Sequence, residues 1–294
     1  MVLLPTIHKI LVAFDGSPNS IDACDAVGIF AKGYNSHVLI AYVVPPLPLL
    51  TPPRRLEYEA RFENKTSLKM LEMESRFSKM GLEVKTRVLH AKRSVASSLI
   101  DLSEKEQVDL MVAGTRGMGD FRRMILGSVS TNLLNNAPCP VLVVRKRISQ
   151  VEPQIRKMLV ATDGSKFASR AVELAVSVAK KLNADLTIVH VIYVAPIAYG
   201  GMISPELYKD LRKDADEIIS KASEVAKENG VSAATKIIDE NRGPVWAITK
   251  FSEDGGFDLI VVSTRGLGGL KKLFLGSVAN GIAHYAKCSV LVAR

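Results

Sequence analysis

The chain repeats itself, and this repeat limits its fold more than any other feature of the sequence. The segment KILVAFDGS at residues 9–17 returns as KMLVATDGS at 157–165. Farther along, VDLMVAGTRGMG at 108–119 returns as FDLIVVSTRGLG at 257–268, and between the two pairs the offset grows by a single residue. Two copies of this length predict two similar domains rather than a solenoid of short repeats.

The ends of the copies also match, and they locate the boundary between the domains. The segment PCPVLVVR at 138–145 corresponds to KCSVLVAR at 287–294. Between the copies, KRISQVEPQI at 146–155 is polar and contains proline, which is typical of an exposed linker. We expect the first domain at 1–147 and the second at 154–294. A chain of 294 residues, 47% of them apolar, can fill two cores of this size.

Within each half, short apolar runs alternate with amphipathic runs. In the first half we expect strands at 9–14, 37–44, 82–89, 108–113 and 140–145, and helices at 18–33, 54–80, 94–106 and 128–136. Ser17 followed by Pro18 is typical of a helix start, and Ser128 is expected to cap the last helix. Strands that are apolar throughout and alternate with helices predict a doubly wound α/β fold, with a parallel sheet covered on both faces.

The run GTRGMGDFRRMILGS at 114–128 joins an expected strand to an expected helix. Glycines alone more often mark a turn than a ligand site. At a strand–helix junction, however, unpaired N–H groups at the positive end of the helix dipole bind phosphate readily. In a doubly wound sheet the ligand crevice lies where the winding reverses, which brings Asp15 close to Gly114. The sequence therefore predicts a phosphate-binding site in the first half.

These residues resemble the universal stress protein family in its tandem two-domain form. The resemblance covers nearly the whole chain and rests on three features: a strand ending in Asp-Gly-Ser, the pattern G-x2-G-x9-G-[S/T], and the closing APCPVLVV at 137–144. It implies that each domain has a five-stranded parallel sheet in the order 3-2-1-4-5. Because one branch of the family binds ATP with Mg²⁺ or Mn²⁺ at its phosphates, it also implies ATP as the cofactor.

The resemblance further implies which residues bind the nucleotide. Asp15 would accept a hydrogen bond from the adenine edge, Val43 would offer its main chain to the base, and the glycines would let the chain approach ribose and phosphate. The first-half set is Ala13, Phe14, Asp15, Val43, Gly114, Arg116, Gly117, Gly127, Ser128, Val129 and Ser130. The less expected second-half set is Asp163, Val191, Ser263, Arg265, Gly266, Gly276, Ser277 and Val278.

Several of these residues have a second interpretation. Asp15 is also typical of a local turn or cap, and Arg116 of a solvated turn. Ser263 replaces the first glycine of the pattern, so its Cβ either crowds the ribose or, if φ is negative, costs nothing. The basic pairs at 122–123 and 271–272 either favour a triphosphate or solvate a loop. The run PPLPLLTPP at 45–53 is either a docking segment or a stiff crossover, and we favour the crossover.

Composition narrows the remaining function classes. Three cysteines without a secretory start favour a reducing compartment, so we expect a cytoplasmic protein without a membrane span. The formal charge of +9 is spread among acidic residues without an aromatic-interleaved basic patch, so nucleic acid is not the expected partner. Neither the histidines nor the cysteines have the spacing of metal ligands, and no protein metal site is expected. No Walker lysine follows the glycines, which argues against efficient ATP hydrolysis.

The leading interpretation is an ATP-binding universal stress protein that acts as a sensor or regulator rather than as an enzyme. Nucleotide occupancy would order the glycine loops and bias a contact with a protein partner. By resemblance, the closing strands 141–144 and 290–292 would join the halves into an internal pseudo-dimer, and self-association of the chain as a homodimer is a further expectation. The alternatives are a slow nucleotide hydrolase or transferase, and a stress protein that binds no nucleotide and acts through protein contacts.

Overall fold

The computed structural model describes residues 2–46, 52–115, 126–145, 154–193, 204–266 and 275–294, and for 52–65 the main chain alone. The chain forms two compact units, one of Thr6–Pro153 and the other of Gln154–Arg294 together with Met1–Pro5. In the described ranges, no helix is both long enough and apolar enough to span a membrane. The predicted linker lies mostly outside these ranges.

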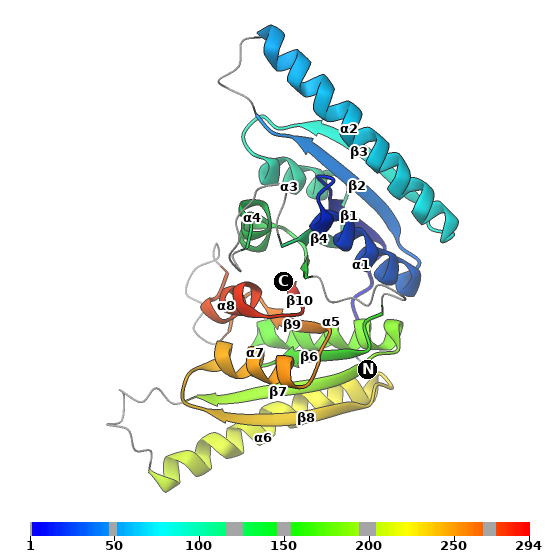
Figure 1. The fold of residues 1–294 in the computed structure, drawn as a ribbon. Helices are drawn as coiled ribbons and strands as arrows, with labels where there is room; N and C mark the ends of the chain where they lie inside the picture. The colour runs from blue at the N-terminus through cyan, green and yellow to red at the C-terminus, as the bar shows by residue number, and fades with distance from the viewer. Residues whose placement is uncertain (1, 47–51, 116–125, 146–153, 194–203, 267–274) are drawn as a thin grey trace. The chain divides into compact units, whose positions relative to one another are not determined.

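In the first unit, parallel strands lie in the order β3-β2-β1-β4-β5. The strands are β1 (Lys9–Ala13), β2 (His37–Val44), β3 (Val84–His90), β4 (Leu110–Gly114) and β5 (Val141–Val144). Helices α1 (Pro18–Tyr34) and α2 (Pro52–Lys79) cover one face, and α3 (Val95–Lys105) and α4 (Ser128–Asn136) cover the other (Figure 1). The winding therefore reverses between β1 and β4.

The second unit repeats this arrangement in the order β8-β7-β6-β9-β10. Its strands are β6 (Lys157–Ala161), β7 (Asp185–Tyr193), β8 (Ala233–Glu240), β9 (Leu259–Ser263) and β10 (Ser289–Ala293). Helices α5 (Lys166–Leu182) and α6 (Pro205–Glu228) cover one face, and α7 (Pro244–Asp254) and α8 (Ser277–Tyr285) the other (Figure 1). Here the winding reverses between β6 and β9.

The predicted fold class and strand order are confirmed in both halves. In the first half, each predicted element begins and ends within two residues of the corresponding observed element. One detail was wrong: Gly127 caps α4, and Ser128 is its first helical residue. Because glycine has no side chain to accept a hydrogen bond, the first-turn amides of α4 lack a side-chain cap.

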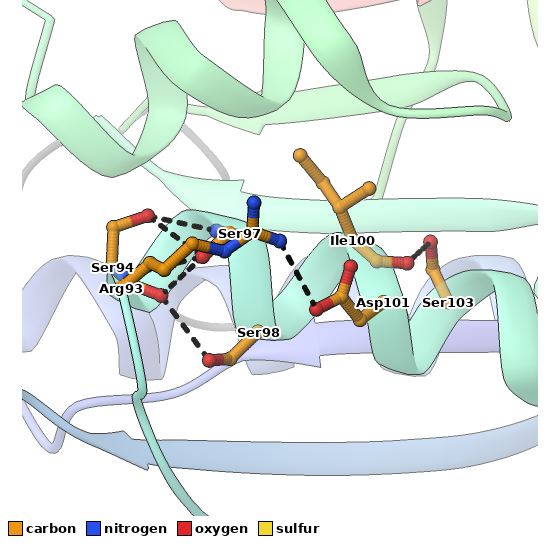
Figure 2. Close-up of polar contacts among 7 residues, drawn as sticks. All are labelled: Arg93, Ser94, Ser97, Ser98, Ile100, Asp101 and Ser103. Carbon is orange, nitrogen blue, oxygen red and sulfur yellow. Dashed lines mark hydrogen bonds and ion pairs between the residues drawn. The ribbon is translucent and has the colours of Figure 1, made fainter.

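Helix α3 begins with a cluster of serines that orients it toward the sheet. Figure 2 shows Ser94 and Ser97 exchanging hydrogen bonds: the Ser97 amide donates to Ser94 Oγ at 3.1 Å, and the Ser94 amide donates to Ser97 Oγ at 3.2 Å. This capping box satisfies two main-chain donors at the helix start. The matching helix α7 instead begins at Gly243, whose φ of 104° favours glycine, and continues with Pro244.

An aspartate in each copy joins the amino ends of the two central strands. Asp109, just before β4, accepts hydrogen bonds through Oδ2 from the amides of His8 at 2.8 Å and Lys9 at 2.9 Å. Asp258, just before β9, accepts from the amides of Arg156 and Lys157, both at 2.9 Å. The recurring Asp-Leu of the sequence repeat therefore holds β1 against β4 and β6 against β9, at the end of each sheet away from the glycine loops.

Replacing Asp109 with alanine should lower the unfolding free energy by about 2 kcal/mol, since two amides lose a charged acceptor. Asp109→Asn, which keeps an oxygen acceptor, should lose less. Asp101→Ala is the matched control, because this exposed carboxylate has only a 3.9 Å ion pair with Arg93. Urea unfolding followed by circular dichroism measures all three variants, and equal losses for Asp101→Ala and Asp109→Ala would contradict the proposed role.

The cysteines are packing residues. Cys24, Cys139 and Cys288 are all buried, and these three described residues form no disulfide. Burial, with a smaller contribution from the neighbouring Asp25 carboxylate, raises the pKa of the Cys24 thiol to about 12, while Arg76 lowers it. Cys24 therefore stays a neutral thiol at physiological pH and contributes to the core between α1 and α2 as a small apolar side chain.

Candidate functional site

The loop that follows the fourth strand of each unit is closed at its base by one main-chain hydrogen bond. In the first unit the Gly127 amide donates to the Thr115 carbonyl at 2.7 Å, and in the second the Gly276 amide donates to the Thr264 carbonyl at 2.7 Å. Both glycines are helix N-caps without a side-chain cap, of α4 and α8 respectively. Each loop therefore returns to its strand and presents the uncapped amides of a helix beside the strand end.

In the second unit, these elements surround a cavity of about 650 Å³. All eight residues of the predicted second-half set line it: Asp163, Val191, Ser263, Arg265, Gly266, Gly276, Ser277 and Val278. They come from the carboxyl ends of β6, β7 and β9 and from the start of α8. The volume lies in the range of pockets that enclose small molecules, which run from about 300 to 1,000 Å³.

Asp163 follows β6 and lies at the centre of this arrangement. Its Oδ1 accepts a hydrogen bond from the Ser165 amide at 3.1 Å, so the aspartate does form the local turn that was its alternative interpretation. Its Oδ2 lies against Gly266, where a Cβ atom would overlap it. Oδ1 of this carboxylate therefore forms the turn, whereas Oδ2 lies against Gly266 in the wall of the cavity.

Ser263 does not close the second cavity. Its hydroxyl donates to the Arg265 carbonyl at 2.5 Å, which turns the side chain into the base of the loop. Ser263 is not one of the non-glycine residues with a positive φ in the described part of the chain. This favours the alternative in which its Cβ costs nothing. The guanidinium of Arg265 lies 5.3 Å from the centre of the Phe167 ring, in the first turn of α5.

The edge of β7 extends past its neighbour at this end of the sheet. Pairing between β6 and β7 ends at Ala161 and Val189, and the Thr162 amide then donates to the Val189 carbonyl at 2.9 Å. Val191 lies beyond this last bond, so no described strand pairs with it on the β6 side. A ligand at the carboxyl end of β6 can reach the main chain of Val191, as the resemblance implies.

In the first unit, a cavity of about 210 Å³ lies at the matching place. Of the predicted first-half set, Ala13, Phe14, Asp15, Val43, Gly114, Val129 and Ser130 line it. Gly127 and Ser128 are not among its lining residues, and Arg116 and Gly117 lie outside the described residues. Asp15 accepts a hydrogen bond from the Ser17 amide at 2.9 Å, as Asp163 does from Ser165.

Two first-half residues have contacts other than those expected. A Cβ on Gly114 would lie 2.5 Å from the Asn19 carbonyl oxygen, so the close approach that this glycine permits is to α1. The Ser130 hydroxyl donates to the Gly114 carbonyl at 2.6 Å. Because a hydroxyl has one hydrogen to donate, the expected donation from Ser130 to phosphate does not fit this geometry. Contact between Gly114 and ribose stays a prediction.

The two cavities differ in size and at two matched positions of their linings. The second unit has Thr162 and His190 where the first has Phe14 and Tyr42, and all four residues line their cavities. The half with the intact glycine pattern has the smaller described cavity, although the glycine pattern had made it the more expected site.

Comparison with known proteins decides the family. The model of the universal stress protein family matches residues 6–145 and again residues 154–294. The chain belongs to the universal stress protein family. Each half matches this family model separately, so the suspected tandem form is confirmed.

Known universal stress proteins match one or both halves. The Bacillus subtilis universal stress protein YxiE is 35% identical over 147 residues, which are 47% of this chain and 98% of that protein. A universal stress protein of Mycolicibacterium smegmatis is 28% identical over 303 residues, covering 100% of this chain and 99% of its own. The crystal structure of a universal stress protein from Archaeoglobus fulgidus DSM 4304 has a TM-score of 0.73 at 22% identity, covering 98% and 97% of the two chains. The last likeness supports the fold alone.

Several residues that line the cavity of the second half were not predicted from the sequence. The missed residues that line it include Thr162, His190, Tyr193, Pro244 and Ile248. His190 had been interpreted as an ordinary strand-end residue. The available signal was its position next to Val191 at the carboxyl end of a strand, the end at which such sheets bind ligands.

Proposed function

We propose that this universal stress protein binds ATP in the cavity of its second half and acts as a nucleotide-dependent regulator. The observation that carries the proposal is the convergence of all eight predicted residues on one cavity of about 650 Å³. Asp163 and the main chain of Val191 would bind the base. The uncapped amides at the start of α8, with Ser277, would bind the phosphates.

These residues fit a nucleotide better than they fit a metal ion alone. Asp163 is the only carboxylate among the described residues that line the cavity, and in the described part of the chain no group of three or more acidic, histidine or cysteine side chains could hold a metal. ATP would therefore bring Mg²⁺ or Mn²⁺ bound mainly to its own phosphates. Arg265 would supply the positive charge from the protein side.

The proposal also covers the first half of the chain, the location of the protein in the cell and its partners. Asp15, Val43 and the start of α4 would form a second, narrower site. We propose a cytoplasmic location because free thiols persist in reducing compartments. By resemblance, β5 and β10 would join the halves as an internal pseudo-dimer, with a homodimer or another protein as the partner that occupancy regulates.

Regulation is favoured over catalysis. Efficient hydrolysis needs a base to activate water at the phosphates, and Asp163, the only carboxylate among the described lining residues, is the proposed contact to the base of the nucleotide instead. We therefore expect ATP to be bound and released largely unchanged, with the conformation of the glycine loop as the output.

Titration of the nucleotide-free protein with ATP and Mg²⁺ in a calorimeter tests the proposal. Trp246, the single tryptophan of the chain, lies in α7 between the cavity residues Pro244 and Ile248. We expect saturable binding that changes Trp246 fluorescence and that Asp163→Asn weakens about tenfold, the loss of one charged hydrogen bond. Asp258→Asn, at the other end of the same sheet, is the control and should bind normally. Failure of the wild-type chain to bind ATP would refute the proposal.

A further inference from the structure

His190 lines the cavity of the second half but belongs neither to the glycine pattern nor to the predicted site. His190 lies at the carboxyl end of β7, next to Val191, and lines the cavity. Its Nδ1 lies 2.8 Å from the carbonyl oxygen of Thr162, which precedes Asp163. The imidazole therefore connects the ends of β6 and β7 at the place where the base is proposed to bind, and it lines the same cavity as Asp163, the other proposed acceptor for the base.

The hydrogen bond to Thr162 determines which nitrogen carries the proton. A carbonyl oxygen accepts hydrogen bonds and cannot donate one, so Nδ1 must carry the hydrogen. In the neutral imidazole, Nε2 then has no hydrogen and is an acceptor. The bond also fixes the ring between the two strand ends, so the acceptor is held in one orientation.

We infer that His190 recognises the exocyclic amine of the base through Nε2. The inference rests on the proposed function, because it assumes that a nucleotide occupies this cavity. An amine at C6 of a purine donates a hydrogen bond to this acceptor, whereas an oxo group at C6 would direct a lone pair at it. The second half would therefore select aminopurine nucleotides over oxopurine nucleotides and over purines without a group at C6.

The first half does not offer the same acceptor. Tyr42 occupies the matching position and lines the smaller cavity. A phenol and an imidazole differ in size and in the direction of their acceptor, so the two halves would differ in how strongly they depend on the amine. Base selection would thus be a property of the second site.

Purine riboside triphosphate is the sharpest probe, since it differs from ATP only in lacking the amine and keeps N1 as an acceptor. Binding of each nucleotide, with Mg²⁺, is measured by Trp246 fluorescence and by calorimetry. The amine has two hydrogens, one for Nε2 of His190 and one for the carboxylate of Asp163, so we expect the wild-type chain to bind ATP about a hundredfold more tightly than the probe, which corresponds to two hydrogen bonds.

The decisive variant is His190→Asn. The amide nitrogen of asparagine can take the place of Nδ1 and keep the bond to the Thr162 carbonyl, but asparagine has no group at the place of Nε2. We expect the preference for ATP over the probe to fall about tenfold, because the amine keeps its hydrogen bond to Asp163, while the thermal stability stays close to that of the wild type. His190→Phe, which fills the space without any nitrogen, should lose the same part of the preference.

His284→Asn is the matched control. The Nδ1 of His284 also lies 2.8 Å from a main-chain carbonyl, that of Asn280, but His284 lies in the last turn of α8 and does not line the cavity. This variant should keep the wild-type preference for ATP.

The outcomes separate the two ideas. A wild-type chain that binds ATP and the probe equally, or a His190→Asn or His190→Phe variant that keeps the full wild-type preference, would overturn the role of His190 and leave ATP binding intact. A wild-type chain that binds neither nucleotide would overturn the proposed function itself. A preference that falls in both His190 variants and persists in His284→Asn supports the inference.

Discussion

Replacing Gly266 with alanine is expected to weaken ATP binding to the second half about tenfold while the domain stays folded. A Cβ at this position would overlap Oδ2 of Asp163. That oxygen is at the end of a side chain that can rotate, so the domain can accommodate the methyl group at the expense of the position of the carboxylate. Since Asp163 is the proposed contact to the base, binding should fall more than stability.

Calorimetry and Trp246 fluorescence measure this effect, and a double-mutant cycle identifies its cause. If alanine at 266 acts by displacing Asp163, adding Asp163→Ala should weaken binding little further, because both changes remove the same contact. Gly28→Ala, on α1 of the first unit, is the control: its Cβ would lie 2.9 Å from Cε of Met80, the flexible end of that side chain, and 3.7 Å from Cε1 of Phe77, an ordinary contact. Unchanged ATP affinity in Gly266→Ala would contradict the proposed role of Asp163.

Replacing Gly114 with alanine is expected to destabilise the first domain by about 3 kcal/mol, because the added atom overlaps main chain that has little room to move. The ideal Cβ lies 2.5 Å from the Asn19 carbonyl oxygen and 2.7 Å from its carbonyl carbon. Relief requires α1 to move away from β4, and these two elements share the core of the unit. Valine, with two further methyl groups, should cost more.

The second unit supplies the control for this experiment. Ser263, which occupies the place of Gly114, has a Cβ already and uses its hydroxyl on the Arg265 carbonyl. Ser263→Ala should therefore cost only about 1 kcal/mol, the value of one hydrogen bond. In thermal unfolding of Gly114→Ala, circular dichroism should register a transition lowered by about 5 °C or more, while Trp246 should report an unchanged second unit. A melting curve identical to that of the wild type would show that α1 yields without cost.

Gly114 and Ser263 show why the glycine pattern alone does not predict which half has the larger described cavity. Gly114 belongs to the pattern, yet the close approach observed at this glycine is to a helix and not to a ligand. Ser263 breaks the pattern, yet its side chain turns away into the loop base. A pattern records where a side chain is absent, but the neighbour that requires its absence becomes visible only when the strand and the helix are packed together.

The sequence by itself determined the architecture of this protein. The duplication, the alternation of apolar strands with amphipathic helices, and the cap at Ser17 are local or periodic properties, so they predicted two doubly wound domains and nearly every boundary in the first. The family pattern likewise predicted which strand ends would meet, because strand order fixes the crevice.

Only the tertiary structure decided the volume and the polar groups of the two cavities. His190, Thr162 and Pro244 reach the second cavity from three different elements, and the contrast with Phe14 and Tyr42 depends on which side chains face inward at each strand end. Which side chains face the cavity is set by packing between segments far apart in the chain, and no local pattern encodes that packing. The chemistry of the site is therefore a property of the packed domain, whereas its location is already present in the order of the strands.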